Sequence, residues 1–192
     1  MRLQVQIACA EAEVPSRDQF ESWAAAALAT SAARGGKTTA GEVTIRVVGR
    51  AEMSDLNRRY RGRDGATDVL AFAFDGEGAA APLDILGDVV ICAPVLAAEA
   101  ARREIPELNH WAHLTAHGVL HLCGFDHGAD ADAREMGALE REILAEFGIA
   151  LDGESAASGN STAESPSPAD STAESPVENS PAAPAMEPAP AR

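Results

Sequence analysis

The sequence predicts an α+β domain in which about five helices pack on one small, mixed, four-stranded sheet. Two observations support this fold class. Short segments that alternate apolar and polar residues, as half-buried strands do, are interspersed with longer segments whose apolar residues recur at helical spacing. The composition then changes sharply after residue 151, so we expect residues 1–151 to form the domain and residues 152–192 to form a tail.

In the first part of the domain, strand and helix patterns take turns along the chain. Residues 3–9 alternate apolar and polar side chains and predict the first strand. Ser16 begins a capping box at the start of an Ala-rich helix over 17–34. The β-branched, alternating run 42–48 predicts the second strand, and the pattern over 51–61 is helical.

The second part of the domain contains two strands followed by three helices. The short, apolar runs 69–74 and 85–92 favour strands. A proline suits the first position of a helix over 94–103. The next helix is expected to open at Pro106, and apolar residues at helical spacing predict the last helix over 131–147.

The segment 152–192 has the composition of a disordered acidic tail. Seven of the eleven prolines lie there, among Ser, Ala, Glu and Thr, and the hexapeptide Ser-Thr-Ala-Glu-Ser-Pro occurs at both 161–166 and 171–176. Such a composition cannot bury enough apolar surface to offset the entropy lost on ordering. An inert tail is the favoured interpretation, with a docking role as the alternative.

The formal charge of −15 is unevenly distributed, so by itself it does not exclude a nucleic-acid partner. The tail carries seven acidic residues and one basic residue, which leaves −9 for residues 1–151. A local basic patch can exist on this acidic body. Six arginines lie within 18 residues, at positions 46, 50, 58, 59, 61 and 63.

The chain has the features of a cytoplasmic protein without a membrane partner. No apolar run approaches the roughly 18 residues that a membrane-spanning helix requires. The alternating residues at the start of the chain differ from the continuous apolar block of a signal peptide. Cys9, Cys92 and Cys123 are odd in number, widely spaced and set among apolar residues, which favours reduced, buried thiols over disulfides.

The strongest functional pattern is a group of three histidines between positions 117 and 127. His117 and His121 are four residues apart, so on a helix they project from one face. Gly124 suits the left-handed conformation that ends a helix, and the returning chain can deliver His127 as a third nitrogen ligand. Three imidazoles with a fourth position left to water predict one catalytic zinc ion per chain.

Two further histidines precede this group on the same predicted helix. At about 100° per residue, positions 110, 113, 117 and 121 fall within an arc of roughly 80°. The roles of His110 and His113 stay open from the sequence. For His113 we weigh a hydrogen-bonding partner of a ligand, a substrate contact, and a polar rim at the mouth of the pocket, and we favour the rim.

The histidine spacing is also similar to the H-E-x-x-H-x-x-G-x-x-H motif of one class of zinc proteases. Those proteases need a Glu next to the first histidine as the general base. This chain has Gly118 at that position. Peptide hydrolysis is therefore the poorer prediction.

The segment from His117 to His127 resembles the H-G-x-L-H-L-x-G-Y-D-H signature of the YbeY family of bacterial endoribonucleases and rRNA maturation factors. Other blocks of the domain resemble that family too, and the resemblance covers roughly residues 1–151. These blocks are 56–62, 67–70, 87–91 and 136–144. Phe125 replaces the usual Tyr of the signature, and Ala71 and Ala73 replace a usual Ser and Pro.

The resemblance implies a single-strand-specific endoribonuclease that matures rRNA ends, notably of the small subunit, and takes part in ribosome quality control. It implies that His117, His121 and His127 bind the zinc and that Arg61 is the other functional residue. The implied partners are RNA, the ribosomal small subunit and a ribosome-assembly GTPase.

The residues themselves suggest a division of labour. Arg61 is suited to bidentate contact with a phosphate, although it can instead form a solvated helix end or an ion pair with Asp64. Asp126 adjoins a ligand and can orient a histidine. Asp68 and Asp88 are candidates for the pocket lining or for turns and caps. The general base stays unassigned, as does the choice between water and the RNA 2′-hydroxyl as nucleophile.

Two other functions are compatible with the sequence. One is a non-enzymatic ribosome-assembly factor whose zinc is structural or supports a binding surface; the missing base favours it, and the open fourth position opposes it. The other is metal-dependent hydrolysis of a different phosphoester or amide, because three histidines do not specify a substrate.

Overall fold

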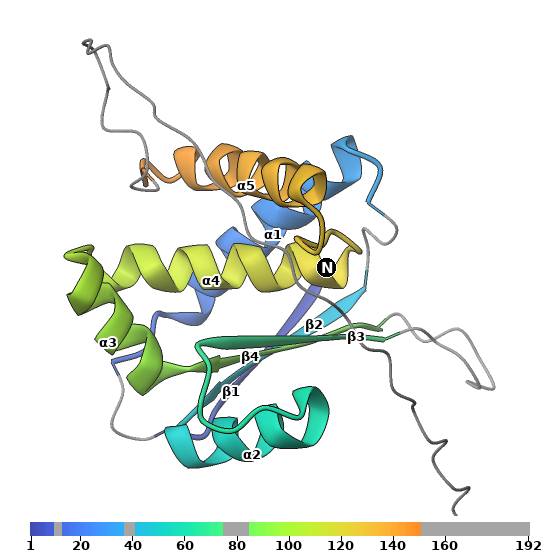
Figure 1. The fold of residues 1–192 in the computed structure, drawn as a ribbon. Helices are drawn as coiled ribbons and strands as arrows, with labels where there is room; N and C mark the ends of the chain where they lie inside the picture. The colour runs from blue at the N-terminus through green and yellow to red at the C-terminus, as the bar shows by residue number, and fades with distance from the viewer. Residues whose placement is uncertain (10–12, 37–40, 75–84, 151–192) are drawn as a thin grey trace, which may run out of the picture. The chain divides into compact units, whose positions relative to one another are not determined.

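The computed structural model describes residues 1–9, 13–36, 41–74 and 85–150, and their elements follow the predicted order (Figure 1). The described strands are β1 (Arg2–Ile7), β2 (Glu42–Val48), β3 (Val69–Ala73) and β4 (Ile85–Cys92). The described helices are α1 (Arg17–Ala33), α2 (Arg50–Arg61), α3 (Ala93–Arg103), α4 (Glu107–Leu122) and α5 (Asp130–Ala145). The tail predicted over 152–192 lies outside the described residues.

The four strands form one mixed sheet in the order β1-β2-β4-β3. Strands β1, β2 and β4 are parallel, whereas β3 runs antiparallel to β4, with Val69 opposite Ile91 and Ala73 opposite Gly87. The α+β fold class with a small mixed sheet is therefore confirmed. The strand order leaves β3 at the edge of the sheet, where it contacts α4, the helix that carries the histidines.

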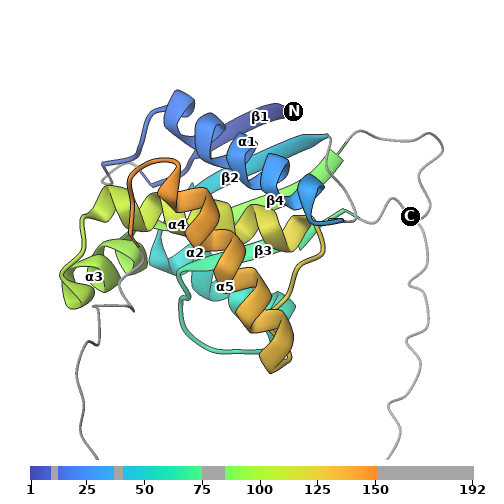
Figure 2. The ribbon, with the colours of Figure 1, turned by 90° about the horizontal axis from the view of Figure 1, so that it is seen from above.

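The helices lie on both faces of the sheet. Helices α1, α4 and α5 lie on one face and α2 lies on the other (Figure 1). Helix α4 contacts α1, α3 and α5 as well as strands β3 and β4. Seen from above, α1 and α5 lie over α4 (Figure 2). The histidine-bearing helix thus lies in the middle of the packed structure, where its neighbours restrict its side chains.

Strand β4 shows how alternation divides the core between the two faces. Val89 and Ile91 belong to the main core, beneath α1 and α4. Val90 and Cys92 point the other way and form a smaller cluster with Met53 of α2. The two clusters pack α4 and α2 against opposite faces of the same sheet.

The predicted boundaries agree with the observed ones to within about two residues, the usual uncertainty at fraying helix ends. The last helix was expected over 131–147 and spans Asp130–Ala145. Pro106 precedes α4 as its N-cap residue and is not its first helical residue. The capping box at Ser16 is confirmed, since its side chain accepts the backbone N–H of Gln19.

The cysteines agree with the prediction of reduced thiols. All three cysteines are free, and Cys92 and Cys123 are buried while Cys9 is partly buried. Burial raises the pKa of the Cys92 and Cys123 thiols, so these side chains are protonated at neutral pH. No helix among the described residues is long and apolar enough to cross a membrane.

Candidate metal centre

One face of helix α4 presents a row of histidines. The rings of His113 and His117 have centroids 6.1 Å apart, and those of His117 and His121 are 4.6 Å apart. This spacing follows from the helical geometry that puts residues three and four apart on one side. Nε2 of His117 and Nε2 of His121 face each other at 3.1 Å, so two ligand atoms converge on one point.

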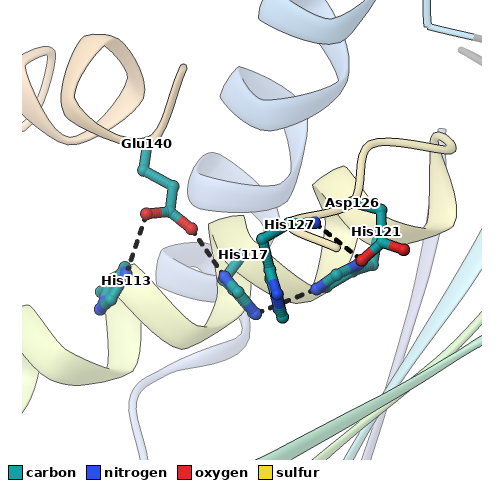
Figure 3. A network of polar contacts seen from close by, with 6 residues as sticks. All are labelled: His113, His117, His121, Asp126, His127 and Glu140. Carbon is teal, nitrogen blue, oxygen red and sulfur yellow. Dashed lines mark hydrogen bonds and ion pairs between the residues drawn. The ribbon is translucent and has the colours of Figure 1, made fainter. Parts of the chain in front are cut away.

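The turn after α4 brings in a third histidine. The helix ends at Leu122, and Gly124 takes a φ of 90°, the left-handed conformation that glycine adopts without a steric penalty. The backbone N–H of Phe125 then donates to the carbonyl of Leu120 at 3.1 Å, which closes the turn. The ring of His127 consequently lies 5.6 Å from that of His117 and 5.0 Å from that of His121. Figure 3 shows the three side chains gathered at one place.

The three imidazoles fit a metal ion. Each of His117, His121 and His127 offers one nitrogen, and these three atoms lie within 4.8 Å of one another. Burial and the adjacent His117 and His127 lower the pKa of His121 to about 4, so His121 is neutral at physiological pH. A neutral imidazole is the form that binds metal. The described residues can therefore hold a metal ion at the predicted place.

A carboxylate from a distant part of the chain orients this cluster. Glu140 of α5 accepts a hydrogen bond from Nδ1 of His117 at 2.6 Å and one from Nε2 of His113 at 3.3 Å (Figure 3). Because an ionised carboxylate only accepts, we assign the proton of His117 to Nδ1, which leaves the lone pair of Nε2 facing the cluster. Burial alone would raise the pKa of Glu140, but the bonds from the two histidines outweigh it and lower the pKa to about 2.

Sequence reasoning did not assign a role to Glu140, although a signal was present. Glu140 lies four residues after Met136 and three before Ile143, both buried. At helical spacing those positions share one face, so a charged residue was placed on the apolar side of α5. Only 9% of Glu140 is exposed. A carboxylate in such a position needs a partner, which here is a pair of histidines.

Asp126, predicted to orient a ligand, lies beside the cluster but makes a different contact. Its Oδ1 accepts the backbone N–H of His127 at 2.7 Å, and this hydrogen bond lowers the pKa of the carboxyl. The distance from Oδ1 to Nδ1 of His121 is 4.0 Å, which exceeds hydrogen-bonding distance. The Asp126 side chain is 72% exposed. Its observed contact holds the turn that carries His127.

The histidine cluster opens into a cavity of about 580 Å³ that also contains arginines. His121, Asp126 and His127 line it together with Arg61 and Arg63 from the end of α2 and the turn that follows. Two cationic side chains thus share one open space with two of the three candidate ligands. The α2 region and the histidine turn are far apart in the sequence, and their meeting is a result of the tertiary fold.

The edge strand β3 contributes small side chains to the same cavity. Ala71 and Ala73 line it, whereas Phe72 points to the opposite face of the sheet and lines another cavity with Tyr60. This alternation is the normal property of a strand. The two alanines, at positions where a Ser and a Pro were expected from the resemblance, leave open space beside the histidines.

The arginines of α2 differ in their ionic partners. Arg58 pairs with Asp64 at 3.1 Å and with Asp55 at 3.6 Å. The alternative in which Asp64 pairs with Arg61 is therefore not what the structure shows. Among the described residues, neither Arg61 nor Arg63 has a carboxylate within ion-pairing distance. Both guanidinium groups are available to an anion in the cavity.

The other two aspartates that we considered for the pocket are elsewhere. Asp88 lies within β4, on the strand face opposite to Val89, and it lines the cavity on the α2 side. Asp68 precedes β3 and accepts the backbone N–H of Val69 and the hydroxyl of Thr67, both at 2.9 Å. Of the two alternatives left open for these aspartates, the metal cavity does not apply to Asp88, because strand alternation points it to the other face of the sheet, and Asp68 makes local hydrogen bonds of the capping kind.

His110 and His113 also have positions that spacing did not determine. His113 does not line the cavity that contains His121; it lines a separate one beside Asn109, so the rim interpretation is wrong. His110 is 1% exposed, and its ring nitrogens make no hydrogen bond in the described part of the chain. The Glu99 carboxylate lies 3.4 Å from its Nε2, and this contact is an ion pair only when His110 is protonated.

An α+β domain in which three histidines that can hold a metal ion share a cavity with two arginines has the arrangement of residues found in metal-dependent enzymes. Residues 4–148 match the family model described as "Endoribonuclease YbeY", and the chain belongs to this family. Relatives named "Endoribonuclease YbeY" include one from Alkalilimnicola ehrlichii, 49% identical over 150 residues, which covers 77% of this chain and 88% of the relative. Another, from Nitrosococcus oceani, is 44% identical over 145 residues and covers 75% and 91%.

A solved structure resembles the chain as well. It is the solution structure of a protein from Thermotoga maritima, with a TM-score of 0.47 and 21% identity. The match covers 76% of this chain and 91% of that protein.

Proposed function

We propose that this chain is a zinc-dependent endoribonuclease that cleaves single-stranded RNA. The observation that carries the proposal is the shared cavity, in which the histidine cluster meets Arg61 and Arg63. Membership of the family and the names of its relatives supply the reaction class. The match over 4–148 supports the assignment of the activity to a domain of residues 1–151, separate from a tail of 152–192.

His117, His121 and His127 would bind the metal, one ion per chain, and imidazole nitrogens are ligands that suit zinc. When bound there, zinc supplies a Lewis acid that polarises a phosphoryl oxygen and increases the acidity of water. Asp126 holds the turn that presents His127, through the backbone hydrogen bond described above.

Arg61 and Arg63 would bind the RNA backbone. A guanidinium group presents paired N–H donors that match two phosphate oxygens, and its charge opposes the negative charge that develops on the phosphate. Neither guanidinium has a carboxylate within ion-pairing distance among the described residues, and Asp126 lines the same cavity, so both arginines can turn toward a phosphate there. Ala71 and Ala73 leave room along the edge strand for a single strand of nucleic acid.

For the cellular role we propose maturation of rRNA ends, notably of the small subunit, with a part in ribosome quality control. The proposed partners are rRNA, the small ribosomal subunit and a ribosome-assembly GTPase, and the proposed location is the cytoplasm. These assignments are supported by the family to which the chain belongs.

An RNA-cleavage assay with purified, zinc-loaded, full-length protein tests the proposed activity. We expect the protein to cleave a single-stranded RNA while leaving the same sequence intact in a duplex. We expect His121→Ala to lose this activity and Arg61→Ala to decrease it by about 10–100-fold. Equal cleavage by the wild type and by both variants would identify a contaminating nuclease and overturn the proposal.

Complementation separates the enzyme from a non-enzymatic assembly factor. In cells that lack the protein, wild-type chain should restore correct rRNA ends, whereas folded His121→Ala protein should not. Full rescue by His121→Ala would favour a binding role, because that variant lacks a candidate ligand.

A further inference from the structure

His117 uses both of its ring nitrogens in the described structure. Nε2 faces His121 at 3.1 Å, and Nδ1 lies 2.6 Å from Oε1 of Glu140. The two nitrogens point in opposite directions across the ring, so Glu140 approaches from the side away from the ligand cluster. It is a partner of the ligand and does not compete for the metal position.

We propose that Glu140 is a positioning residue for the metal centre, acting through His117. This inference rests on the metal site of the proposed function. The carboxylate holds the proton of His117 on Nδ1 and fixes the ring orientation, so that Nε2 presents its lone pair toward His121 and His127. The negative charge of Glu140 also makes the imidazole a stronger electron donor.

The position of Glu140 supports this role. The residue is on α5 and its two hydrogen-bond partners are on α4, so the packing of two helices holds its carboxylate in place. His113 donates to the second carboxylate oxygen at 3.3 Å, which satisfies the other half of a nearly buried charge. His113 thus supports Glu140, which in turn orients His117.

A second metal ion is the competing interpretation of the same residues. His113, His117 and Glu140 also place three ligand atoms within 4.8 Å of one another. An ion bound there would have to replace the hydrogen bond between Glu140 and Nδ1 of His117 and use both nitrogens of one ring. The short hydrogen bond at that place favours the positioning role.

The proposal is tested by measuring the zinc affinity of the folded full-length protein in competition with a chromophoric chelator. The variant Glu140→Gln keeps the shape of the side chain and removes its charge, and we expect about 10–100-fold weaker zinc binding. The matched control is Glu142→Gln on the same helix, which removes an exposed carboxylate paired with Arg34 at 2.7 Å. This control should bind zinc as the wild type does.

Two more measurements separate positioning from a loss of stability. The visible spectrum of the Co2+-substituted protein reports the ligand geometry directly and should change in Glu140→Gln but not in Glu142→Gln. If Glu140→Gln does not fold, Glu140→Asp keeps the charge, retracts the oxygens from His117, and should bind zinc with intermediate affinity.

Two results would overturn the proposal. Wild-type zinc affinity in folded Glu140→Gln or Glu140→Asp would exclude the positioning role, and two tightly bound zinc ions per wild-type chain would favour the second metal site. None of these readouts uses RNA. Loss of zinc affinity in Glu140→Gln together with an inactive wild type would refute the endoribonuclease and leave this inference intact.

Discussion

Gly118 and Val89 are in such close contact that position 118 has no space for a side chain. A Cβ atom built on Gly118 would lie 2.5 Å from Cγ1 of Val89. Helix α4 therefore lies directly on strand β4 next to its first candidate ligand. The Glu that a zinc protease needs at this position is excluded by packing as well as by the sequence.

The first prediction concerns this contact. Gly118→Ala should destabilise the protein by a net amount of about 1–2 kcal/mol, because the added methyl group overpacks the helix–strand interface at a cost in the upper part of the usual range of roughly 1–3 kcal/mol. The expected gain in helix propensity is only about 1 kcal/mol. Urea unfolding measures the change, and Val89→Ala should relieve part of it, so that the double variant is more stable than additivity predicts. An unchanged free energy of unfolding in Gly118→Ala would contradict the close packing.

The second prediction concerns the arginines of the cavity. Arg61→Ala and Arg63→Ala should each lower kcat/KM for RNA by about 10–100-fold, as expected for the loss of a charge-assisted hydrogen bond worth roughly 1.5–3 kcal/mol. Arg58→Ala is the matched control, since its guanidinium is already paired with Asp55 and Asp64. If Arg58→Ala and Arg63→Ala were equally impaired, general charge and not the cavity would explain the effect.

The third prediction concerns metal removal. Chelation should abolish RNA cleavage and lower the Tm, because an ion that binds only the folded state stabilises it. Added zinc should restore both properties, with one ion bound per chain. His121→Ala should be insensitive to the chelator in a thermal unfolding experiment. Full activity after exhaustive dialysis against chelator, with no metal detected, would count against a metal-dependent reaction.

The fourth prediction concerns His110. Burial, followed by the charges of His113 and Arg103, lowers the pKa of this histidine, with Glu99 acting in the opposite direction. The unfolded chain therefore binds a proton at about pH 6.5 that the folded chain does not bind, so stability falls as the pH decreases below that value. Above it, His110 contributes no pH dependence.

The variant His110→Gln tests this sign. The free energy of unfolding, measured in urea between about pH 7 and pH 5, should decrease less steeply with acidification in His110→Gln than in the wild type. His121 has the same direction of shift, so some slope should persist in the variant. A steeper decrease in His110→Gln would show that His110 gains a proton in the folded state.

Local sequence patterns predicted the features that depend on neighbouring residues. His117 and His121 converge because of helical spacing, and Gly124 turns the chain because it adopts a positive φ. The order of strands and helices follows from alternation and periodicity in the same way. These features depend on backbone geometry over a few residues, which the sequence alone determines.

Other features could be decided only by the tertiary structure. Glu140 reaches His117 from another helix, and Arg61 meets His127 across a cavity between segments far apart in the chain. The role of Asp88 stayed open because the face to which a strand residue points is decided only when it is known which side of the sheet holds the site.

The sequence by itself therefore determined the α+β class and the three candidate ligands, since both follow from local periodicity. Only the tertiary structure decided which charges surround these ligands. Glu140 is bonded to His113 and His117, while Arg61 is left without a carboxylate partner among the described residues. The physical reason is that such pairings require helices and strands from separate parts of the chain to pack together, and spacing within one element carries no information about them.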